Sequence, residues 1–487
     1  MLERTSFLLC FCLLAATAAM ADEKGEDWGF HRDVNEELYA QACAACHGER
    51  LEGGPLGATL IKPGLKHGNS LEDIIDSIAN GFPEQGMPAA KETLEDPQIR
   101  RLAMLILELQ AGFTYDSVDP LGVPLEIPTA VQSSEHHRFR LASVAEGLQH
   151  PFSIAPLPDG RILFTEKSVG LSLLSADGRE KTLVKGTPRV YDDNTFRGSA
   201  LIGSGWLLEV ALHPDYEKNG WIYLSYGDRC SDCNALSKST GKPVTMTALV
   251  RGRIEGDRWL DEQAIWRVDT NHYLTGHNQA AGARIAFDDE GHLFFSVGGI
   301  SQEGGIQDLD RPYGKIHRVL DNGRIPSGNP FADVPGAIRS TWSLGHRNPQ
   351  GLAFDKKRRT LWETEHGPRG GDELNLILPS HNYGWPMVSF GMWYDGTPIR
   401  FAEKLGIEYD PKDLTYPVKH WTPSPAISSA VFQLLRLEIE NGEVVHEEIL
   451  LDGLGRFRDV EVGPDGNLYL LVEQYHGSHI VKLSPAR

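Results

Sequence analysis

The chain has few cysteines, no surplus of basic residues and almost no long apolar runs, and each shortage excludes a class of protein. Six cysteines among 487 residues are too few for a scaffold built on disulfides. The 47 Lys and Arg residues are outnumbered by 67 Asp and Glu residues, which gives a formal net charge of −20. Such a chain lacks the basic surface that neutralises phosphates, so we expect it to bind neither nucleic acid nor anionic lipid.

The one marked apolar run stands at the N-terminus. Arg4 supplies a positive charge, residues 7–14 form an apolar run, and residues 19–21 (Ala-Met-Ala) resemble a cleavage site. We therefore predict a signal peptide over residues 1–21 and a periplasmic or secreted protein. The run is too short to span a bilayer, and no other stretch approaches 18 apolar residues, so no membrane span is expected. A lipid anchor on Cys10 is the alternative, although the run is short for that as well.

Residues 31–112 carry helix signals. Asn35 can cap a first helix, Ser70 opens a segment that resembles a capping box, and Asp96 precedes a proline as at many helix starts. Apolar residues recur at three- and four-residue spacing after each signal. We predict a small all-α domain here, followed by an extended, proline-containing linker over residues 113–136.

From residue 137 onward, short strand-like runs alternate with turns rich in Gly, Pro, Asp and Asn. One pattern, a strand followed by an Asp- or Gly-bearing turn and an apolar strand, returns at residues 156–166, 211–228, 286–299, 353–367 and 462–474. Five returns of one hairpin indicate the blades of a β-propeller, although Pro-Asp-Gly hairpins also occur in other β proteins. We therefore predict an all-β propeller over residues 137–487.

Cys43, Cys46 and His47 form the sequence CAACH near the end of the first predicted helix. At this helical spacing the three side chains share one face. Two thioether bonds from the cysteines can hold one haem c covalently, with the histidine as axial ligand to the iron, and CxxCH is the attachment motif for such a haem. A zinc site would need a second Cys or His pair, and a thioredoxin-like disulfide would need a βαβ context. The sequence offers neither near this motif.

Met87 is the predicted second axial ligand of the haem iron. It lies in GFPEQGMPAA, a loop between two predicted helices. A thioether sulfur raises the reduction potential of the haem, which suits an electron acceptor. Met104 is the competitor, but it lies inside the last helix. With CAACH, the Gly-Met-Pro loop and a C-terminal helix, residues 31–112 resemble a class I cytochrome c.

Three blocks of the later sequence carry a second resemblance. They are GHRNPQGLAF (345–354), TEHGPRGGDELNLILPSHNYGWP (364–386) and GRFRDVEVGPDGNLYLL (455–471). In this order they resemble the soluble pyrroloquinoline quinone (PQQ) dehydrogenases of the glucose/sorbosone and aldose-sugar type. The resemblance implies a six-bladed β-propeller that oxidises sugars at C1. The expected fold class is therefore mixed: a small all-α cytochrome c domain followed by an all-β, six-bladed propeller.

PQQ is a planar quinone with three carboxylates, and arginine side chains suit such an anion because they are permanently charged and bidentate. Arg347, Arg456 and Arg458 stand at the family's cofactor-binding positions, and Asn348 and Gln350 match further contacts. Arg456 and Arg458 alternate along a predicted strand, so both face the same side. A lone Arg-Phe-Arg is more often a solvated face, but the three blocks together favour cofactor binding.

The resemblance also implies calcium. One ion is bound by the main-chain oxygens of Gly367 and Pro368 and by the quinone, whose carbonyl the ion would polarise. Asp372, Glu373 and Tyr383 match a second, structural calcium site of the family. Acidic pairs often simply face water, which is the alternative for this second site.

Transfer of hydride to the quinone needs a base for the proton of the sugar hydroxyl, and His277 is the candidate. It stands further from Arg284 than the family pattern has it. Gly299 replaces the aspartate that supports this histidine in the family. A strand pair with a cofactor-binding lysine is also missing, since no lysine lies between Lys419 and Lys482. We expect one quinone contact to be lost and one blade to be incomplete.

The expected function is therefore that of an exported quinohaemoprotein. It would oxidise a sugar (aldose) or related alcohol at PQQ and pass electrons to its own haem, then to an external acceptor such as a soluble cytochrome or a copper protein. Two alternatives stay open: a catalytically degenerate propeller that only binds, and a lactonase-like hydrolase with carboxylate-bound calcium. Cys230 and Cys233 lack a following histidine, so a disulfide is expected there, with a metal site or free thiols as alternatives.

Overall fold

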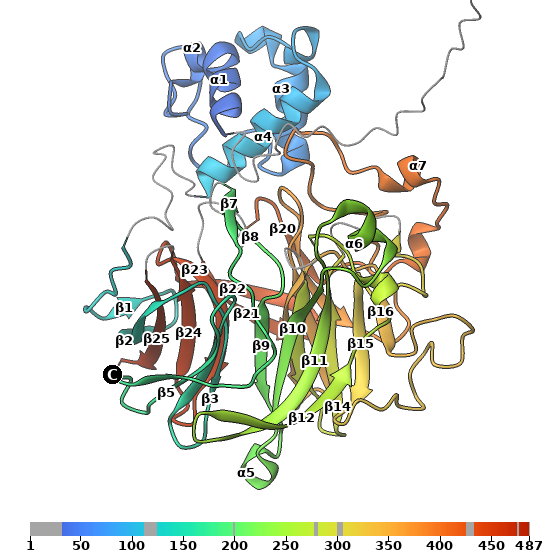
Figure 1. Cartoon of the computed structure of the whole chain (residues 1–487). Helices are drawn as coiled ribbons and strands as arrows, with labels where there is room; N and C mark the ends of the chain where they lie inside the picture. Colours follow the sequence, from blue (N-terminus) through green and yellow to red (C-terminus); the bar gives the residue numbers. More distant parts are fainter. Residues whose placement is uncertain are drawn as a thin grey trace, which may run out of the picture.

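The computed structural model shows a small helical region (blue in Figure 1) at one end of a larger β body. The predicted signal peptide and residues 113–123 of the predicted linker lie outside the described residues. In the part of the chain that is described, no helix is long and apolar enough to cross a bilayer. The described residues are 32–111, 124–197, 200–276, 281–299, 305–424, 433–474 and 477–486.

The helical region has one apolar core that three of its helices share. Tyr39, Ile74 and Leu102 lie in this core with at most 2% of their surface exposed. Within residues 32–111 the elements are α1 (Arg32–Ala42), α2 (Ala44–His47), α3 (Leu71–Asn80), η1 (Pro83–Gln85), η2 (Ala90–Glu92) and α4 (Asp96–Gln110).

The structure confirms one of the predicted helix starts and shifts two. Ser70 caps α3 in a complete capping box with Asp73, as predicted. Asn35 does not cap α1, because the helix already begins at Arg32 and Asn35 is buried inside it. The N-cap of α4 is Glu95, whose amide donates to the side chain of Gln98 at 2.8 Å, so the helix starts one residue earlier than its predicted cap allowed.

Five sheets of four or five strands form the blades among the described residues. Their strand orders are β3-β4-β5-β6, β12-β11-β10-β9, β13-β14-β15-β16, β17-β18-β19-β20 and β1-β2-β25-β24-β23, and two further sheets, β7-β8 and β21-β22, have two strands each. The predicted count of six blades is therefore not confirmed. The strands are β1 (Gln132–Ser133), β2 (Arg138–Leu148), β3 (Pro151–Pro156), β4 (Ile162–Glu166), β5 (Gly170–Leu174), β6 (Lys181–Leu183), β7 (Thr195–Arg197), β8 (Ala200–Ile202), β9 (Leu207–Leu212), β10 (Ile222–Cys230), β11 (Val244–Glu255), β12 (Arg258–Trp266), β13 (Gly282–Phe287), β14 (His292–Val297), β15 (Lys315–Leu320), β16 (Thr341–Leu344), β17 (Pro349–Asp355), β18 (Thr360–Glu365), β19 (Asp372–Ile377), β20 (Lys419–Trp421), β21 (Leu434–Glu440), β22 (Glu443–Leu451), β23 (Arg456–Val462), β24 (Leu468–Glu473) and β25 (Ser478–Pro485).

Each of the five repeated hairpins supplies the first two strands of one blade. They are β3–β4, β9–β10, β13–β14, β17–β18 and β23–β24, all antiparallel. Strand β2, the second of the chain, pairs with the C-terminal strand β25, so one blade joins the two ends of the β body. Short helices lie in the loops: α5 (Tyr216–Asn219), α6 (Ala235–Thr240), η3 (Thr270–His272), α7 (Phe401–Leu405) and η6 (Pro411–Asp413).

The stretch between β20 and β23 is where the sequence indicated an incomplete blade. Its described residues form only the two-stranded hairpin β21–β22, and residues 425–432 lie outside the description. The first strands of the neighbouring blades, β17 and β23, are mostly exposed or half-buried, whereas β3 and β13 are buried along nearly their whole length. Val462 in β23 is 64% exposed. Among the described residues this stretch therefore supplies two strands, and the incomplete blade stays a prediction.

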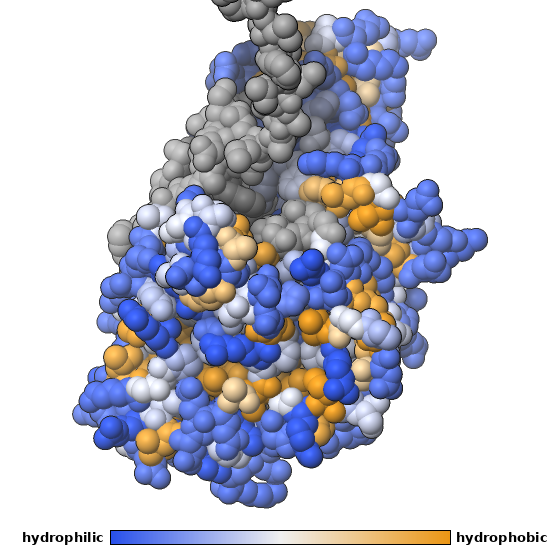
Figure 2. Space-filling view, turned by 45° about the vertical axis from the view of Figure 1, so that its right-hand side comes forward, coloured by the Kyte–Doolittle hydropathy of each residue, from blue (hydrophilic) through white to orange (hydrophobic). Residues whose placement is uncertain are grey.

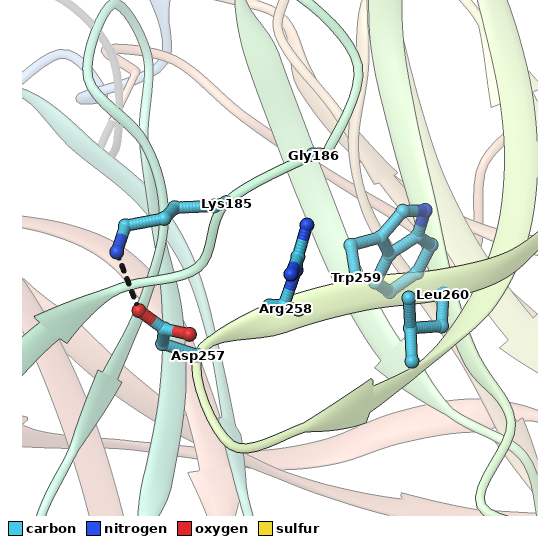
Figure 3. Close-up of a pocket in the computed structure, with 6 residues that line it drawn as sticks. All are labelled: Lys185, Gly186, Asp257, Arg258, Trp259 and Leu260. Carbon is cyan, nitrogen blue, oxygen red and sulfur yellow. Dashed lines mark hydrogen bonds and ion pairs between the residues drawn. The ribbon is translucent and has the colours of Figure 1, made fainter.

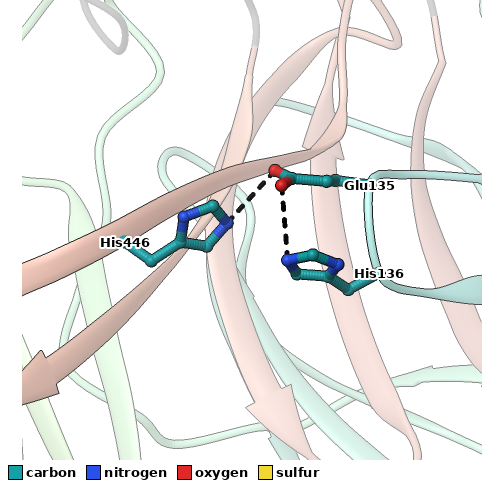
Figure 4. A group of neighbouring side chains, drawn as sticks. All are labelled: Glu135, His136 and His446. Carbon is teal, nitrogen blue, oxygen red and sulfur yellow. Dashed lines mark ion pairs between the residues drawn. The ribbon is translucent and has the colours of Figure 1, made fainter.

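The segment that leads into the β body is held against strand β22 by a network of polar contacts. The buried carboxylate of Glu448 accepts hydrogen bonds from the amide of His136 at 2.8 Å and from Nδ1 of His137 at 2.9 Å. Beside it, the carboxylate of Glu135 lies 3.3 Å from Nε2 of His136 and 3.1 Å from Nε2 of His446 (Figure 4). The C-terminal end of the predicted linker is thereby held in place.

The face of the molecule in Figure 2 is largely hydrophilic, with apolar side chains in small groups. The predicted disulfide is present: Cys230 at the end of β10 is bonded to Cys233. This bond closes a short loop before α6, and it leaves Cys43 and Cys46 as the free cysteines of the described residues.

Candidate functional site

The CAACH residues lie at the junction of α1 and α2. The amides of Cys46 and His47 donate to the carbonyl of Cys43 at 3.1 and 3.0 Å, which keeps the helical spacing that the motif requires. Both thiols are free, and burial together with the neighbouring Cys46 raises the pKa of Cys43 to about 11. Nδ1 of His47 lies 2.8 Å from the carbonyl oxygen of Ala58, a contact that directs Nε2 to a metal. This donor set fits a covalently attached haem.

A glycine is required beside this motif. A Cβ atom at Gly57 would lie 2.7 Å from the carbonyl oxygen of Cys46 and 3.0 Å from Nδ1 of His47. Any larger residue would push the loop away from the imidazole. The chain between the motif and α3 is therefore packed closely around the predicted axial ligand.

The two methionines considered as axial ligands have different surroundings. Met87 lies half-buried in a loop closed by two backbone hydrogen bonds between Phe82 and Met87, at 2.9 and 3.2 Å. Met104 is fully buried on α4, and a Cβ atom at Gly370 of the β body would lie 3.2 Å from its terminal methyl carbon. Met104 thus packs between the helical region and the β body, and the assignment of Met87 to the iron stays a prediction.

The three arginines predicted to bind the cofactor all lie close enough to His366 to lower its pKa, and Arg347 donates to its carbonyl at 2.7 Å. Burial, and then the guanidinium groups of Arg458, Arg347 and Arg456, hold the pKa of His366 well below its ordinary value. Arg456 and Arg458 come from β23, whereas Arg347 lies between β16 and β17. His366 follows β18, so three separate segments converge here. Sequence reasoning did not single out His366, although it stands within the block that carried the family resemblance.

A single carboxylate faces several of these cations. Oε2 of Glu473 lies 2.6 Å from Nε of Arg458 and 3.5 Å from a terminal nitrogen of Arg456, and its Oε1 lies 3.6 Å from Nζ of Lys167. Burial alone would raise the pKa of Glu473, but Arg458 and Lys167 hold it well below its usual range. Burial, and then Arg458, lower the pKa of Lys167 to about 7. Two arginines against one carboxylate leave an excess of positive charge, to which Lys167 adds when it is protonated, and such an excess suits a polyanionic ligand.

Asn348 and Gln350 lie next to Arg347, as predicted, and they contact each other. Nε2 of Gln350 donates to Oδ1 of Asn348 at 2.9 Å. The backbone amides of Arg347 and Asn348 both donate to one carboxylate oxygen of Glu365. Buried Arg284 donates to the backbone carbonyl of Gln350 at 2.8 Å. This turn is therefore held by buried charged groups on both sides.

The segment predicted to bind calcium surrounds a small cavity. The carbonyl of Gly367 accepts a hydrogen bond from Arg347 at 2.7 Å, and a carbonyl with two lone pairs can accept this bond and also ligate a cation. Arg347, Gly367, Glu373 and Tyr383 line one cavity of about 10 Å³, the size of a single small occupant. The structure thus brings predicted residues of both calcium sites to the same cavity. Pro368, the other main-chain ligand predicted for the first ion, follows Gly367 in the same turn and is buried.

Two predicted ligands of the second calcium have other partners. One oxygen of Asp372 accepts from the amide of Gly367 at 2.9 Å and the other from Ser424. The hydroxyl of Tyr383 donates to the carbonyl of Leu376 at 2.5 Å. Both side chains therefore fix the loops around the cavity.

A cluster of buried carboxylates beside the cavity fits a hard cation better. Nδ2 of Asn375 donates to Glu363, Glu365 and Glu373, at 3.0, 3.4 and 3.2 Å. Burial, and then the charge of Glu365, raise the pKa of Glu363 and of Glu373 well above the usual value. Oε1 of Glu363 and Oδ1 of Asn375 are buried and form no hydrogen bond within the described residues. Such surplus acceptor oxygens are the ligands that calcium prefers. Only Glu373 of this cluster was among the sequence candidates.

The predicted base, His277, lies outside the described residues. The position of its missing carboxylate partner is described, and packing explains the glycine there. The amide of Gly299 donates to the carbonyl of Arg347 at 2.8 Å, and a Cβ atom on Gly299 would lie 2.9 Å from the side chain of Ile306 and 3.0 Å from the amide of Gly314. An aspartate would not fit in this arrangement.

A larger surface hollow of about 380 Å³ lies elsewhere (Figure 3). It is lined by Lys185, Gly186 and residues 257–260 at the start of β12, and Lys185 pairs there with Asp257 at 2.6 Å. None of the predicted site residues lines it. Its size therefore does not mark the functional site.

Replacing Lys167 with methionine tests the charge excess of the arginine cluster. The pKa of Lys167 is about 7 in the folded protein, against about 10.4 for an exposed lysine. Between these values the unfolded chain binds more protons, so the stability of the wild type rises with pH relative to the variant. We expect urea unfolding without added cofactor to show this. The difference in free energy of unfolding between the wild type and the variant should change by up to about 1.4 kcal/mol per pH unit. A difference that is constant from neutral to alkaline pH would contradict this.

Two family models match this chain, one over the β body and one over the helical region. The family model "Glucose / Sorbosone dehydrogenase" matches residues 148–433 and 430–482, and "Cytochrome C oxidase, cbb3-type, subunit III" matches residues 33–106. The aldose sugar dehydrogenase of Escherichia coli is 34% identical over 367 residues, which cover 69% of this chain and 91% of that protein. The crystal structure of the soluble aldose sugar dehydrogenase from E. coli, in its apo-form, aligns with a TM-score of 0.60 and 30% identity over 72% of this chain and 100% of that one.

The helical region has its own relative. Cytochrome c55X of Paracoccus denitrificans is 32% identical over 102 residues, which cover 21% of this chain and 93% of that protein. The chain therefore belongs to the glucose/sorbosone dehydrogenase family and joins a sugar-dehydrogenase-like β-propeller to an N-terminal cytochrome c domain.

Proposed function

We propose that this protein oxidises an aldose or a related alcohol at PQQ and passes the electrons to its own haem c. The observation that carries the proposal is a cluster of largely buried arginines: Arg347 donates to the carbonyl of His366 at 2.7 Å, and Arg456 and Arg458 share the carboxylate of Glu473, in a chain that also contains CAACH. Bound PQQ would supply a quinone that accepts a hydride from the sugar carbon. The propeller would occupy residues 137–487 and the cytochrome domain residues 31–112.

The residues of this chain would bind and orient the reactants. Arg347, Arg456 and Arg458 would hold carboxylates of the cofactor, and Lys167 would add a fourth cation where the family's lysine segment is missing. Glu473 keeps the cations in place through its contacts with Arg458 and Arg456. Calcium would be held by carbonyls at Gly367 and Pro368 and, at the second site, by the carboxylate cluster.

The acid–base step needs a neutral side chain close to the sugar hydroxyl. His277 remains our candidate base from its position in the sequence. His366, whose pKa is held far below neutral, stays uncharged among the arginines and adds no further positive charge to the cluster. The proposed setting is the periplasm or the outside of the cell, with a soluble cytochrome or a copper protein as the external acceptor.

Reconstitution with PQQ and calcium is the decisive experiment. Aldoses and alcohols should then reduce a dye acceptor and, without the dye, the haem. The linker keeps the two domains at a high effective concentration, so the rate constant of haem reduction should not depend on protein concentration. A second-order dependence would contradict relay within one chain. A protein that neither reduces the dye nor hydrolyses lactones would be a degenerate binding module, and lactone hydrolysis alone would favour a hydrolase.

A further inference from the structure

One face of α4 is turned toward the propeller. Pro97, Arg101, Met104 and Glu108 follow one another at spacings of four, three and four residues, so they form a stripe along one side of the helix. Other residues of α4 fill the core of the helical region. In Figure 1 α4 lies between the remaining helices and the β body. The helix therefore packs against two partners.

An ion pair joins this stripe to the propeller. Nε and a terminal nitrogen of Arg369 donate to the two carboxylate oxygens of Glu108, at 2.8 and 2.7 Å. The side chain of Arg369 is 9% exposed and that of Glu108 is 19% exposed. Surface ion pairs contribute little, but a bidentate and largely buried pair has both strength and a defined direction. Breaking it would leave a buried guanidinium without a counter-ion.

Close packing surrounds the ion pair. Met104 is fully buried, and a Cβ atom at Gly370 would lie 3.2 Å from its methyl carbon. A Cβ atom at Gly396 would lie 2.2 Å from the carbonyl oxygen of Pro97 and 2.6 Å from the side chain of Arg101. Since both glycines also have positive φ, at 77° and 85°, larger residues are disfavoured there on two grounds. The surface of α4 and the facing surface of the propeller are thus complementary in shape.

The contact lies on the same turn as the proposed cofactor site. Arg369 and Gly370 follow Gly367, whose carbonyl accepts a hydrogen bond from Arg347 at 2.7 Å. Two backbone hydrogen bonds between Arg369 and Met392, at 3.0 and 3.1 Å, hold the turn to the neighbouring loop. Arg369, which binds α4 through Glu108, is therefore two residues from Gly367, whose carbonyl contacts the arginine cluster.

We propose that the Glu108–Arg369 pair is the positioning contact that docks the cytochrome domain on the propeller at the edge of the cofactor site. This inference rests on the proposed function. Oxidation of one sugar releases two electrons and two protons. The electrons reduce ferric haem to ferrous haem one at a time, and an external one-electron oxidant reoxidises the haem between them, while the protons leave to solvent. Docking fixes the distance that each electron crosses.

Variants of Glu108 test the contact in the full-length holoprotein. Glu108→Gln keeps the shape and removes the charge, and Glu108→Arg sets two guanidinium groups against each other. Stopped-flow reduction of the haem by sugar should slow about tenfold in the first variant and about a hundredfold in the second. The haem spectrum and the sugar-to-dye activity should stay unchanged, because neither requires docking. Combining Glu108→Arg with Arg369→Glu should restore most of the rate.

Glu37→Gln is the matched control, since Glu37 is an exposed acid on α1 of the same domain. Its haem reduction should equal that of the wild type. Unchanged haem reduction in Glu108→Arg would overturn the inference, and so would a parallel loss of dye activity, which indicates a general structural defect. Failure of the proposed function gives a different result, because the haem of the wild type then stays ferric when sugar is added. That result would also overturn the inference.

Discussion

Replacing Arg458 with methionine is expected to abolish oxidation of sugar that depends on PQQ. Arg458 contributes two nitrogens to Glu473, and its charge, with those of Arg347 and Arg456, lowers the pKa of His366. Removing it takes away one cation of the proposed cofactor site and weakens the hold on a buried carboxylate. Loss of one partner of a buried, hydrogen-bonded charge pair costs about 2–5 kcal/mol. We therefore expect the affinity for PQQ to fall by a factor of roughly 100 or more.

Titration of the apoprotein with PQQ, read out by the rate of dye reduction with sugar, measures this effect. Arg458→Lys should be intermediate, because an ammonium keeps the charge but loses the bidentate geometry. Arg140→Met is the matched control, since Arg140 is an exposed arginine on β2 of the same sheet. The haem spectrum should be unchanged in all three variants. Wild-type affinity in Arg458→Met would remove the basis for PQQ binding in this chain.

The sequence predicted those parts of the fold that depend on neighbouring residues. The Asp- and Gly-bearing turns between β3 and β4 or between β23 and β24 set hairpin geometry locally, so all five hairpins are found where expected. The capping box at Ser70 is equally local. The arginines came from motif positions, and in the structure all three affect the pKa of one buried histidine, His366. Their role as cofactor ligands stays a prediction.

Long-range partners were beyond the reach of sequence patterns. In the sequence, Glu473 stands at the end of an apolar strand. Only the folded blade brings it next to Arg456 and Arg458. Lys167 follows β4, some distance along the chain from the residues that it meets. The second face of α4 was also missed, because its partner Arg369 lies 261 residues away from Glu108. A stripe that mixes a buried methionine with charged residues is the signal that could have revealed it.

Replacing Met87 with alanine is expected to lower the reduction potential of the haem. A thioether ligand favours the ferrous state, and axial ligands set haem potentials over a range of about 0.8 V. Loss of the sulfur should shift the potential down by on the order of 0.1 V or more, as measured by spectroelectrochemical titration. The absorption band of the iron–sulfur bond in the ferric protein should disappear as well.

Met104→Leu is the matched control for this prediction, because it conserves volume at the buried contact with Gly370. Its haem potential and spectrum should equal those of the wild type. The opposite result, an unchanged haem in Met87→Ala and an altered one in Met104→Leu, would assign the ligand to α4. The helix could not then present Met104 to Gly370 and to iron at once, so the docking of the two domains would have to differ from the arrangement in this structure.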